Sequence, residues 1–252
     1  MTEIEGIWSR VQIGDKTADV YEPKQLGTRR SVVLFLHDHD LQTLSDNVAF
    51  SFHLERLGLT AICPHGQRSW WTDAVCREFD PQISPINFIR QRVIPYIFER
   101  WNVEPPRIGL MGIGMGGQGV LQLAYRFPRE FPVVAAISPS VDFQNCYGQG
   151  LPLDEMFASQ EAARQQTATL LILSLNWPRH QFLVCDPADD EWFESVQRLT
   201  SKLFASGIPF ESDLTTTAGG HNWNYFNTLS GRVLMFLADR LDALHAETID
   251  DK

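Results

Sequence analysis

The chain has 252 residues, of which 44% are hydrophobic and 21% charged, and it carries a formal net charge of −10. Length and composition of this kind are typical of a globular protein with one large core. The negative charge argues against nucleic acids and anionic membranes as partners, because both would repel the chain. No apolar stretch reaches the ~18 residues of a membrane span, and the acidic start, MTEIEG, is unlike a signal peptide.

The four cysteines stand far apart and form no CxxC pair; they are Cys63, Cys76, Cys146 and Cys185. This spacing argues against a zinc ribbon or a disulfide scaffold and suits a reducing compartment. No internal repeat or linker divides the chain. We therefore expect a cytoplasmic protein with a single domain over 1–252, in which the acid-rich end, 246–252, is a frayed tail.

Strands are expected to alternate with helices along the chain, after a hairpin formed by 7–13 and 17–21. The expected strands are 31–37, 60–63, 107–111, 133–137, 169–175, 181–185 and 210–216, and the expected helices are 45–57, 85–101, 115–127, 190–206 and 223–245. Apolar runs rich in β-branched residues are typical of strands buried on both faces. The pattern predicts an α/β fold, with a mostly parallel sheet covered by helices on both faces. Ligands of such folds bind beyond the carboxyl ends of the strands.

A glycine-rich turn, Gly-Ile-Gly-Met-Gly-Gly, begins at Gly112 between an expected strand and an expected helix. One interpretation is the nucleophile elbow G-x-S-x-G, which presents a serine above the sheet. Gly112 and Gly116 fit that motif, but Gly114 stands where the serine belongs. A second interpretation is a dinucleotide fingerprint made by Gly112, Gly114 and Gly117, with Asp142 as the acid that binds the ribose. The third is a turn that needs glycine for close packing alone.

Two downstream segments favour the elbow. Asp189 follows an apolar strand, and His221 lies in the stretch Gly-Gly-His-Asn-Trp just before the last expected helix. The order elbow, acid, histidine is the chain order of an α/β-hydrolase triad. Asp190 is the alternative partner of the histidine, and His221 itself could instead cap the final helix.

Several stretches between Ser31 and Leu237 match the motifs of one family. They are 36–38, 63–66, 69–73, 108–117, 138–140, 185–189 and 219–223. Together they resemble the esterase D branch of the α/β-hydrolases, which includes S-formylglutathione hydrolases and mycolyltransferases. The Gly-Gly-His-x-Trp stretch and the elbow with its double glycine are the most specific of these motifs.

The resemblance implies an α/β-hydrolase fold and serine-dependent hydrolysis or transfer of carboxylic esters and thioesters, with no cofactor. Carried over by position, Gly114 takes the place of the nucleophile, Asp189 that of the acid and His221 that of the base. The oxyanion would be bound by the backbone N–H groups of His39 and Met115.

The chain departs from the family pattern at two positions. Gly114 replaces the serine, which removes the covalent step, and Asp38 stands in the oxyanion loop where the family has glycine. The space above Gly114 could admit a water that His221 activates as a general base. The family's Cys-x-x-x-Asp spacing favours Asp189 over Asp190 as the partner of the histidine.

We therefore predict an esterase-like α/β-hydrolase with weak or no covalent catalysis and a retained pocket for a small-molecule ester or acyl ligand. Two alternatives stay open within the family. One is an active hydrolase that uses His221-activated water or a nucleophile from elsewhere, and the other is a serine esterase that carries a Ser→Gly change at 114. A remote alternative is a dinucleotide-binding protein that uses the turn from Gly112 to Gly117. The sequence is compatible with a homo-oligomer.

Other candidate site residues are histidines and tryptophans. His37 and His39 could face the same side of an extended segment, as two metal ligands would. No distant third ligand is identifiable, so no metal is expected. Trp70, Trp71 and Trp223 are predicted to line the pocket, although large aromatic side chains are more often part of the core.

Overall fold

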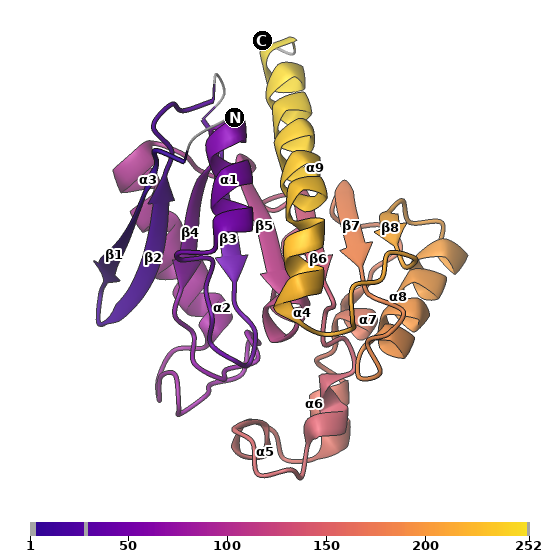
Figure 1. Ribbon diagram of the computed structural model, residues 1–252. Coiled ribbons are helices and arrows are strands. Elements are labelled where there is room, and N and C mark those ends of the chain that lie inside the picture. Colours follow the sequence, from indigo (N-terminus) through magenta and orange to yellow (C-terminus); the bar gives the residue numbers. More distant parts are fainter. Residues whose placement is uncertain (1–3, 28–29, 251–252) are drawn as a thin grey trace.

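The computed structural model describes residues 4–27 and 30–250. They form one 8-stranded sheet in the order β1-β2-β4-β3-β5-β6-β7-β8 (Figure 1). The strands are β1 (Ile7–Ile13), β2 (Lys16–Glu22), β3 (Val32–Leu36), β4 (Thr60–Pro64), β5 (Ile108–Ile113), β6 (Val133–Ile137), β7 (His180–Val184) and β8 (Glu211–Asp213). β1 and β2 form the expected antiparallel hairpin, β2 also pairs antiparallel with β4, and all other pairs are parallel. The predicted α/β fold is confirmed.

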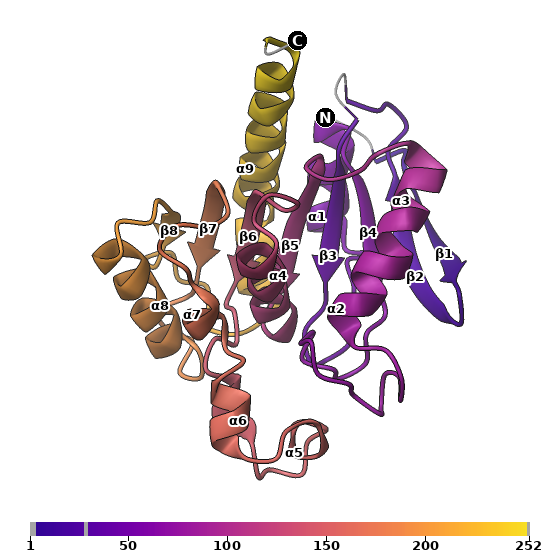
Figure 2. The same ribbon diagram turned by 180° about the vertical axis from the view of Figure 1, so that it is seen from behind.

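Helices cover both faces of this sheet. On one face lie α1 (Val48–Leu57) and α9 (Trp223–Asp250) (Figure 1). On the other lie α2 (Pro85–Phe88), α3 (Ile94–Trp101), α4 (Met115–Arg126) and α8 (Phe193–Ala205) (Figure 2). A π-helical turn, Ile89–Val93, joins α2 to α3. The short helices α5 (Leu153–Met156), α6 (Gln160–Arg164) and α7 (Ala168–Leu171) follow β6, and α5 and α6 lie beyond the carboxyl ends of the strands.

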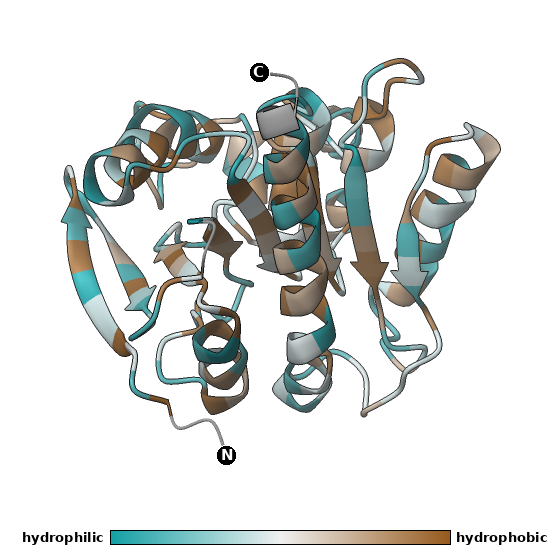
Figure 3. Ribbon diagram, turned by 90° about the horizontal axis from the view of Figure 1, so that it is seen from above, coloured by the Kyte–Doolittle hydropathy of each residue, from teal (hydrophilic) through white to brown (hydrophobic). Residues whose placement is uncertain are grey.

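The sheet separates two hydrophobic clusters. Along β3, Val33 and Phe35 belong to the cluster under α1 and α9, whereas Leu34 and Leu36 belong to the cluster on the other face. Successive side chains of a strand point to opposite faces, so a strand buried on both sides is apolar throughout. Figure 3 shows the central strands mostly brown, whereas the edge strand β1 alternates between brown and teal.

One expected strand is wrong. The stretch 169–175 contains the end of α7 and then a turn closed by a single bridge between Leu173 and Asn176. β6 pairs directly with β7, which leaves this stretch no neighbour in the sheet. Its apolar residues therefore have no ladder to join, and Leu175 is 93% exposed.

The helix boundaries also differ in places from those expected. α1 begins at Val48 after the N-cap Asn47, whose side chain accepts a hydrogen bond from the Phe50 N–H. α9 continues to Asp250, beyond the expected end at 245, and the last two residues lie outside the described part of the chain. Within 4–27 and 30–250, no helix has both the length and the apolar character needed to cross a bilayer.

The turn after β5 depends on the absence of side chains at two glycines. A Cβ on Gly116 would lie 1.9 Å from the carbonyl oxygen of Leu36, and a Cβ on Gly112 would lie 2.2 Å from the carbonyl oxygen of Gly116. Both neighbours are backbone atoms, so no side-chain rotation can relieve the clash. The helix α4 is thereby held against the end of β3.

We expect Gly116→Ala to lower the free energy of unfolding by more than about 3 kcal/mol, since the two backbones must separate. Gly148→Ala is the matched control, because Gly148 has a φ of +87° and a Cβ added there would meet no atom within 4 Å. The free energy of unfolding of that variant should fall by only the ~1–2 kcal/mol that a left-handed conformation costs a residue with a side chain. Urea denaturation measures both values, and equal losses would contradict the close-packing argument.

Candidate active site

The carboxyl ends of the parallel strands bring the turn at Gly114 close to the loops after β3, β7 and β8. Gly114 has φ +53° and ψ −116°, between the last residue of β5 and the first of α4. Its N–H donates to the carbonyl of Ile137 at 3.0 Å, and its own carbonyl accepts from the N–H of Ser140 at 3.0 Å. The turn therefore has the strained strand-to-helix geometry of a nucleophile elbow, without a nucleophile on it.

The acid of the predicted pair lies shortly before the start of α8. Asp189 is 1% exposed, and its Oδ2 accepts a hydrogen bond from His221 Nδ1 at 2.9 Å. Its Oδ1 accepts from the backbone N–H groups of Glu191 at 3.2 Å and Trp192 at 3.0 Å, which fixes the carboxylate. Asp190, the alternative partner, is exposed. The geometry thus joins His221 to Asp189 rather than to its neighbour.

A buried carboxylate that sequence reasoning missed holds the acid loop and the histidine loop together. Asp186 is fully buried and accepts from the backbone N–H groups of Ala188, Ala218 and Gly220 at 2.8, 2.6 and 2.9 Å. Burial raises the pKa of Asp186, but these hydrogen bonds outweigh it and lower the pKa to about 2. Asp186 is a positioning residue, because it fixes the backbone of the loop from which the His221 side chain projects. The sequence signal was its place just after an apolar strand, which many aspartates in turns share.

The space above Gly114 is filled. Asp38 Oδ2 accepts from His221 Nε2 at 2.7 Å, and Asp38 Oδ1 accepts from the Met115 N–H at 2.7 Å. The N–H of His39 also donates to this carboxylate. A Cβ on Gly114 would lie 2.1 Å from Asp38 Oδ1. The expectation of room for a water above the glycine is corrected, because the Asp38 carboxylate lies over Gly114 and accepts hydrogen bonds from the two N–H groups that were predicted to bind an oxyanion.

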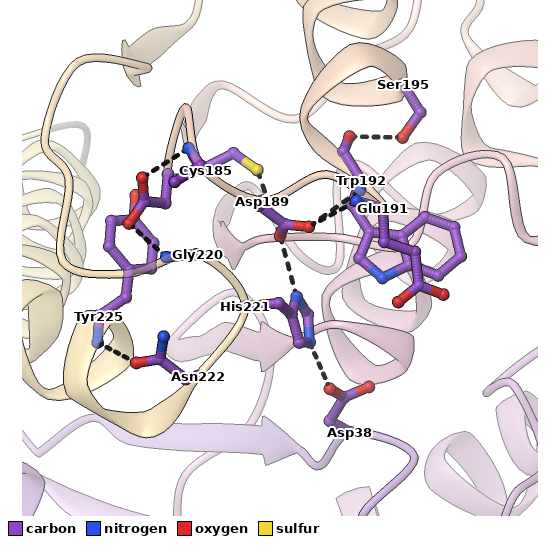
Figure 4. A network of polar contacts seen from close by, with 12 residues as sticks. Asp38, Cys185, Asp189, Glu191, Trp192, Ser195, Gly220, His221, Asn222 and Tyr225 are labelled. Atoms are coloured by element: carbon purple, nitrogen blue, oxygen red, sulfur yellow. Dashed lines mark hydrogen bonds and ion pairs between the residues drawn. The ribbon is translucent and has the colours of Figure 1, made fainter.

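His221 lies between the two carboxylates, one on each ring nitrogen (Figure 4). Burial alone would lower the pKa of His221, but the hydrogen bonds and charges of Asp189 and Asp38 outweigh it and raise the pKa to about 10. The charge of His221 in turn lowers the pKa of both carboxyl groups, against the effect of their burial. At neutral pH the array is therefore an imidazolium between two carboxylates, with no free lone pair on the ring.

A cavity of about 200 Å³ opens beside this array. Its lining residues are Asp38, His39, Trp70, Ser140, Cys146, Gln149, Leu151, Glu191, Trp192 and His221. Of the three predicted pocket tryptophans, Trp70 lines the cavity. Trp71 is fully buried, and its Nε1 donates to the carbonyl of His37 at 3.0 Å. Trp223 lies outside the cavity lining and donates from Nε1 to Asp40 Oδ2 at 3.1 Å.

Two other candidate residues, His37 and Asp142, have structural partners. His37 Nδ1 donates to the carbonyl of Asp38 at 2.7 Å, and its Nε2 accepts from the Gly66 N–H at 3.0 Å, so neither nitrogen offers a metal a lone pair. Asp142, the acid that the dinucleotide alternative requires, forms an ion pair with Arg198 at 2.5 Å.

Comparison with known proteins places this chain in a family. Residues 63–231 match the family model described as Putative esterase. The rat S-formylglutathione hydrolase is 26% identical over 121 residues, which cover 48% of this chain and 43% of that protein. The alignment therefore spans less than half of the relative's length.

Two solved structures share the fold over nearly the whole chain. An S-formylglutathione hydrolase from Agrobacterium tumefaciens superposes with a TM-score of 0.77 at 17% identity, covering 96% of this chain and 98% of that one. An S-formylglutathione hydrolase from Staphylococcus aureus superposes with a TM-score of 0.75 at 13% identity, covering 92% and 98%. The fold is that of an α/β-hydrolase. The chain belongs to the esterase family, in the esterase D-like branch that its motifs resemble.

We expect the ring of His221 to titrate near pH 10, and Asp38→Asn to shift its midpoint downward because one carboxylate is then lost. The pKa of His221 is raised from 6.5 in the unfolded chain to about 10 in the folded one. The contribution of the protonated ring to the free energy of unfolding is therefore complete below about pH 6.5 and lost as the pH rises through about 10. NMR of the imidazole nitrogens follows the titration. A midpoint near 6.5 in the parent protein would refute the two-carboxylate array.

Proposed function

We propose that this member of the esterase family has lost serine-dependent acyl transfer and retains its pocket as a binding site for a small-molecule ester or acyl ligand. The observation that carries the proposal is the position of Asp38 over Gly114. One carboxylate oxygen accepts from Met115 N and the other from His221 Nε2, both at 2.7 Å. Nucleophilic catalysis needs a nucleophile, a free base and an open oxyanion hole. In this chain the nucleophile is missing, and Asp38 occupies both the base, His221, and the Met115 N–H of the oxyanion hole.

The alternative of an active hydrolase that uses His221-activated water is less well supported. A general base must accept a proton at the operating pH. Both ring nitrogens of His221 donate to carboxylates, and its pKa is raised to about 10, so the ring is already protonated at neutral pH. Ester hydrolysis by this route should be slow at pH 7 and increase toward pH 10.

We also propose a cytoplasmic location. It is supported by the four cysteines, each of which is a buried free thiol. A reducing compartment keeps such thiols from pairing.

The proposal is tested with p-nitrophenyl acetate and S-formylglutathione. We expect the parent chain to turn over both esters slowly and without a burst. Gly114→Ser alone should restore little, because its Cβ would lie 2.1 Å from Asp38 Oδ1. Asp38→Gly combined with Gly114→Ser should show a burst and a turnover at least about 100-fold above the parent, since the nucleophile, the base and the oxyanion donors are then all available.

Stopped-flow absorbance of the released nitrophenolate measures the burst, and Asp38→Gly alone is the control that opens the hole without adding a nucleophile. A burst in the parent chain would mean that another residue forms an acyl-enzyme, and would overturn the proposal. A double variant that folds but stays at the parent rate would show that Asp38 is not what blocks the site.

A further inference from the structure

Three donors from different parts of the chain hold the Asp38 carboxylate over the elbow. Its Oδ1 accepts from the Met115 N–H at 2.7 Å, and its Oδ2 accepts from His221 Nε2 at 2.7 Å (Figure 4). The N–H of His39 also donates to it. Two of these donors are backbone groups and the third is an imidazolium. None of them requires that the carboxylate be attached to the chain.

The start of α4 adds to the attraction. Gly114 is the N-cap of this 12-residue helix and has no side chain that could accept from the free N–H groups of the first turn. The Asp38 carboxylate accepts from the first of these groups, at Met115, and lies at the positive end of the helix dipole. The loop after β3 therefore supplies the acceptor that the N-cap of the helix lacks.

The surroundings of Asp38 favour its ionised form. The Asp38 side chain is 15% exposed, and burial raises the pKa of its carboxyl group. The hydrogen bond and charge of His221, followed by the N–H groups of Met115 and His39, outweigh burial and lower the pKa below its usual value. The donors around the group thus prefer a carboxylate to a neutral acid, as a carboxylate-binding site does.

The space that this carboxylate fills is closely bounded by the elbow. A Cβ on Gly114 would lie 2.1 Å from Asp38 Oδ1, 2.2 Å from Cγ and 2.4 Å from Oδ2. The turn leaves room for the carboxylate and for no side chain at 114. Asp38 also lines the cavity of about 200 Å³, so a ligand in that cavity lies next to the same donors.

We propose that these donors form a carboxylate-binding site whose ligand is built into the chain, and that Asp38 thereby excludes free carboxylates from the pocket. A free acid must displace a group that is tethered beside the site and competes at a high effective concentration. The inference rests on the proposed function, since it states which ligands the retained pocket takes. They are uncharged compounds such as an ester, rather than the acid formed from it, and Asp38 is the residue that determines this specificity.

Removal of the Asp38 side chain tests the inference, with the ring of His221 as the probe. Asp38→Gly deletes a CH₂–COO⁻ group, which acetate matches in size. The Asp38 backbone stays in place, because its carbonyl accepts from the Leu41 N–H at 3.0 Å and from His37 Nδ1 at 2.7 Å. The midpoint of the His221 titration should fall in this variant, and about 100 mM acetate should raise it again by about one pH unit.

NMR of the imidazole nitrogens measures these midpoints. Acetamide has the shape of acetate without its charge and should not reproduce the shift, and neither should sodium chloride at the same ionic strength. In the parent chain acetate should leave the His221 midpoint unchanged, because Asp38 already fills the site.

A second truncation identifies the place where the anion binds. Asp38→Ala keeps the Cβ, so the remaining space fits formate, whereas the methyl group of acetate would collide with that Cβ. Formate should therefore raise the His221 midpoint more than acetate does in this variant. Asp40→Gly is the matched control in the same loop, since the Asp40 carboxylate accepts only from uncharged groups, the Gln42 N–H and Trp223 Nε1. Neither anion should move the midpoint there.

An acetate shift in the parent chain would overturn the inference, and so would a folded Asp38→Gly variant that ignores acetate or responds equally to acetamide. If Asp38→Gly does not fold, formate with Asp38→Ala decides the same question, and an equal response to formate and acetate there would also contradict the site. These outcomes leave the proposed loss of acyl transfer standing, because that is judged by the burst with p-nitrophenyl acetate. A burst in the parent chain, conversely, would overturn the proposed function whatever acetate does in the Asp38 variants.

Discussion

The site depends on one ionic interaction, the imidazolium of His221 held between Asp189 and Asp38. Each ring nitrogen donates to a carboxylate, at 2.9 Å and 2.7 Å. A buried charge is tolerated when it is paired and its hydrogen bonds are satisfied. The array joins the loops after β3, β7 and β8 across the end of β5, so removal of either carboxylate leaves the cation only half compensated.

The two departures from the family pattern, at Asp38 and Gly114, depend on each other because the two residues lie against one another in the structure. Asp38 and Gly114 are far apart in sequence, but a Cβ at 114 would collide with the Asp38 carboxylate at 2.1 Å. Serine at 114 and this placement of Asp38 are therefore mutually exclusive. The glycine makes room for the carboxylate, and the carboxylate accepts a hydrogen bond from His221 Nε2, to which the hydroxyl of a resting triad serine would instead donate one. Neither residue is explained without the other.

The sequence predicted most of the fold because apolar runs report burial directly. β3, β5 and β6 are apolar throughout and lie in the middle of the sheet. The run 169–175 shows the limit of this signal. An apolar run also forms where a segment packs only one side on the core, and the sequence does not say that β7 already occupies the position beside β6.

The candidate site was also predictable only in part, because the sequence reveals motifs but not contacts between distant residues. Asp189 and His221 belong to motifs with fixed spacing, whereas the contact of Asp38 with His221 joins residues 183 positions apart and comes from no motif. That the oxyanion loop fills the elbow follows from the parallel pairing of β3 with β5, which sets their ends side by side.

The charge of the array is compatible with the proposed loss of acyl transfer and the proposed retention of the pocket. A resting serine triad has an ionised acid, a neutral histidine and a neutral serine, and so a net charge of −1. Here the hydroxyl is replaced by a carboxylate, and the raised pKa of His221 adds a proton to the ring. The two changes cancel, and the array again carries −1. The cavity is thus bordered by an array with the same net charge as a resting serine triad, although both ring nitrogens of His221 are hydrogen-bonded and the Asp38 carboxylate lies over Gly114.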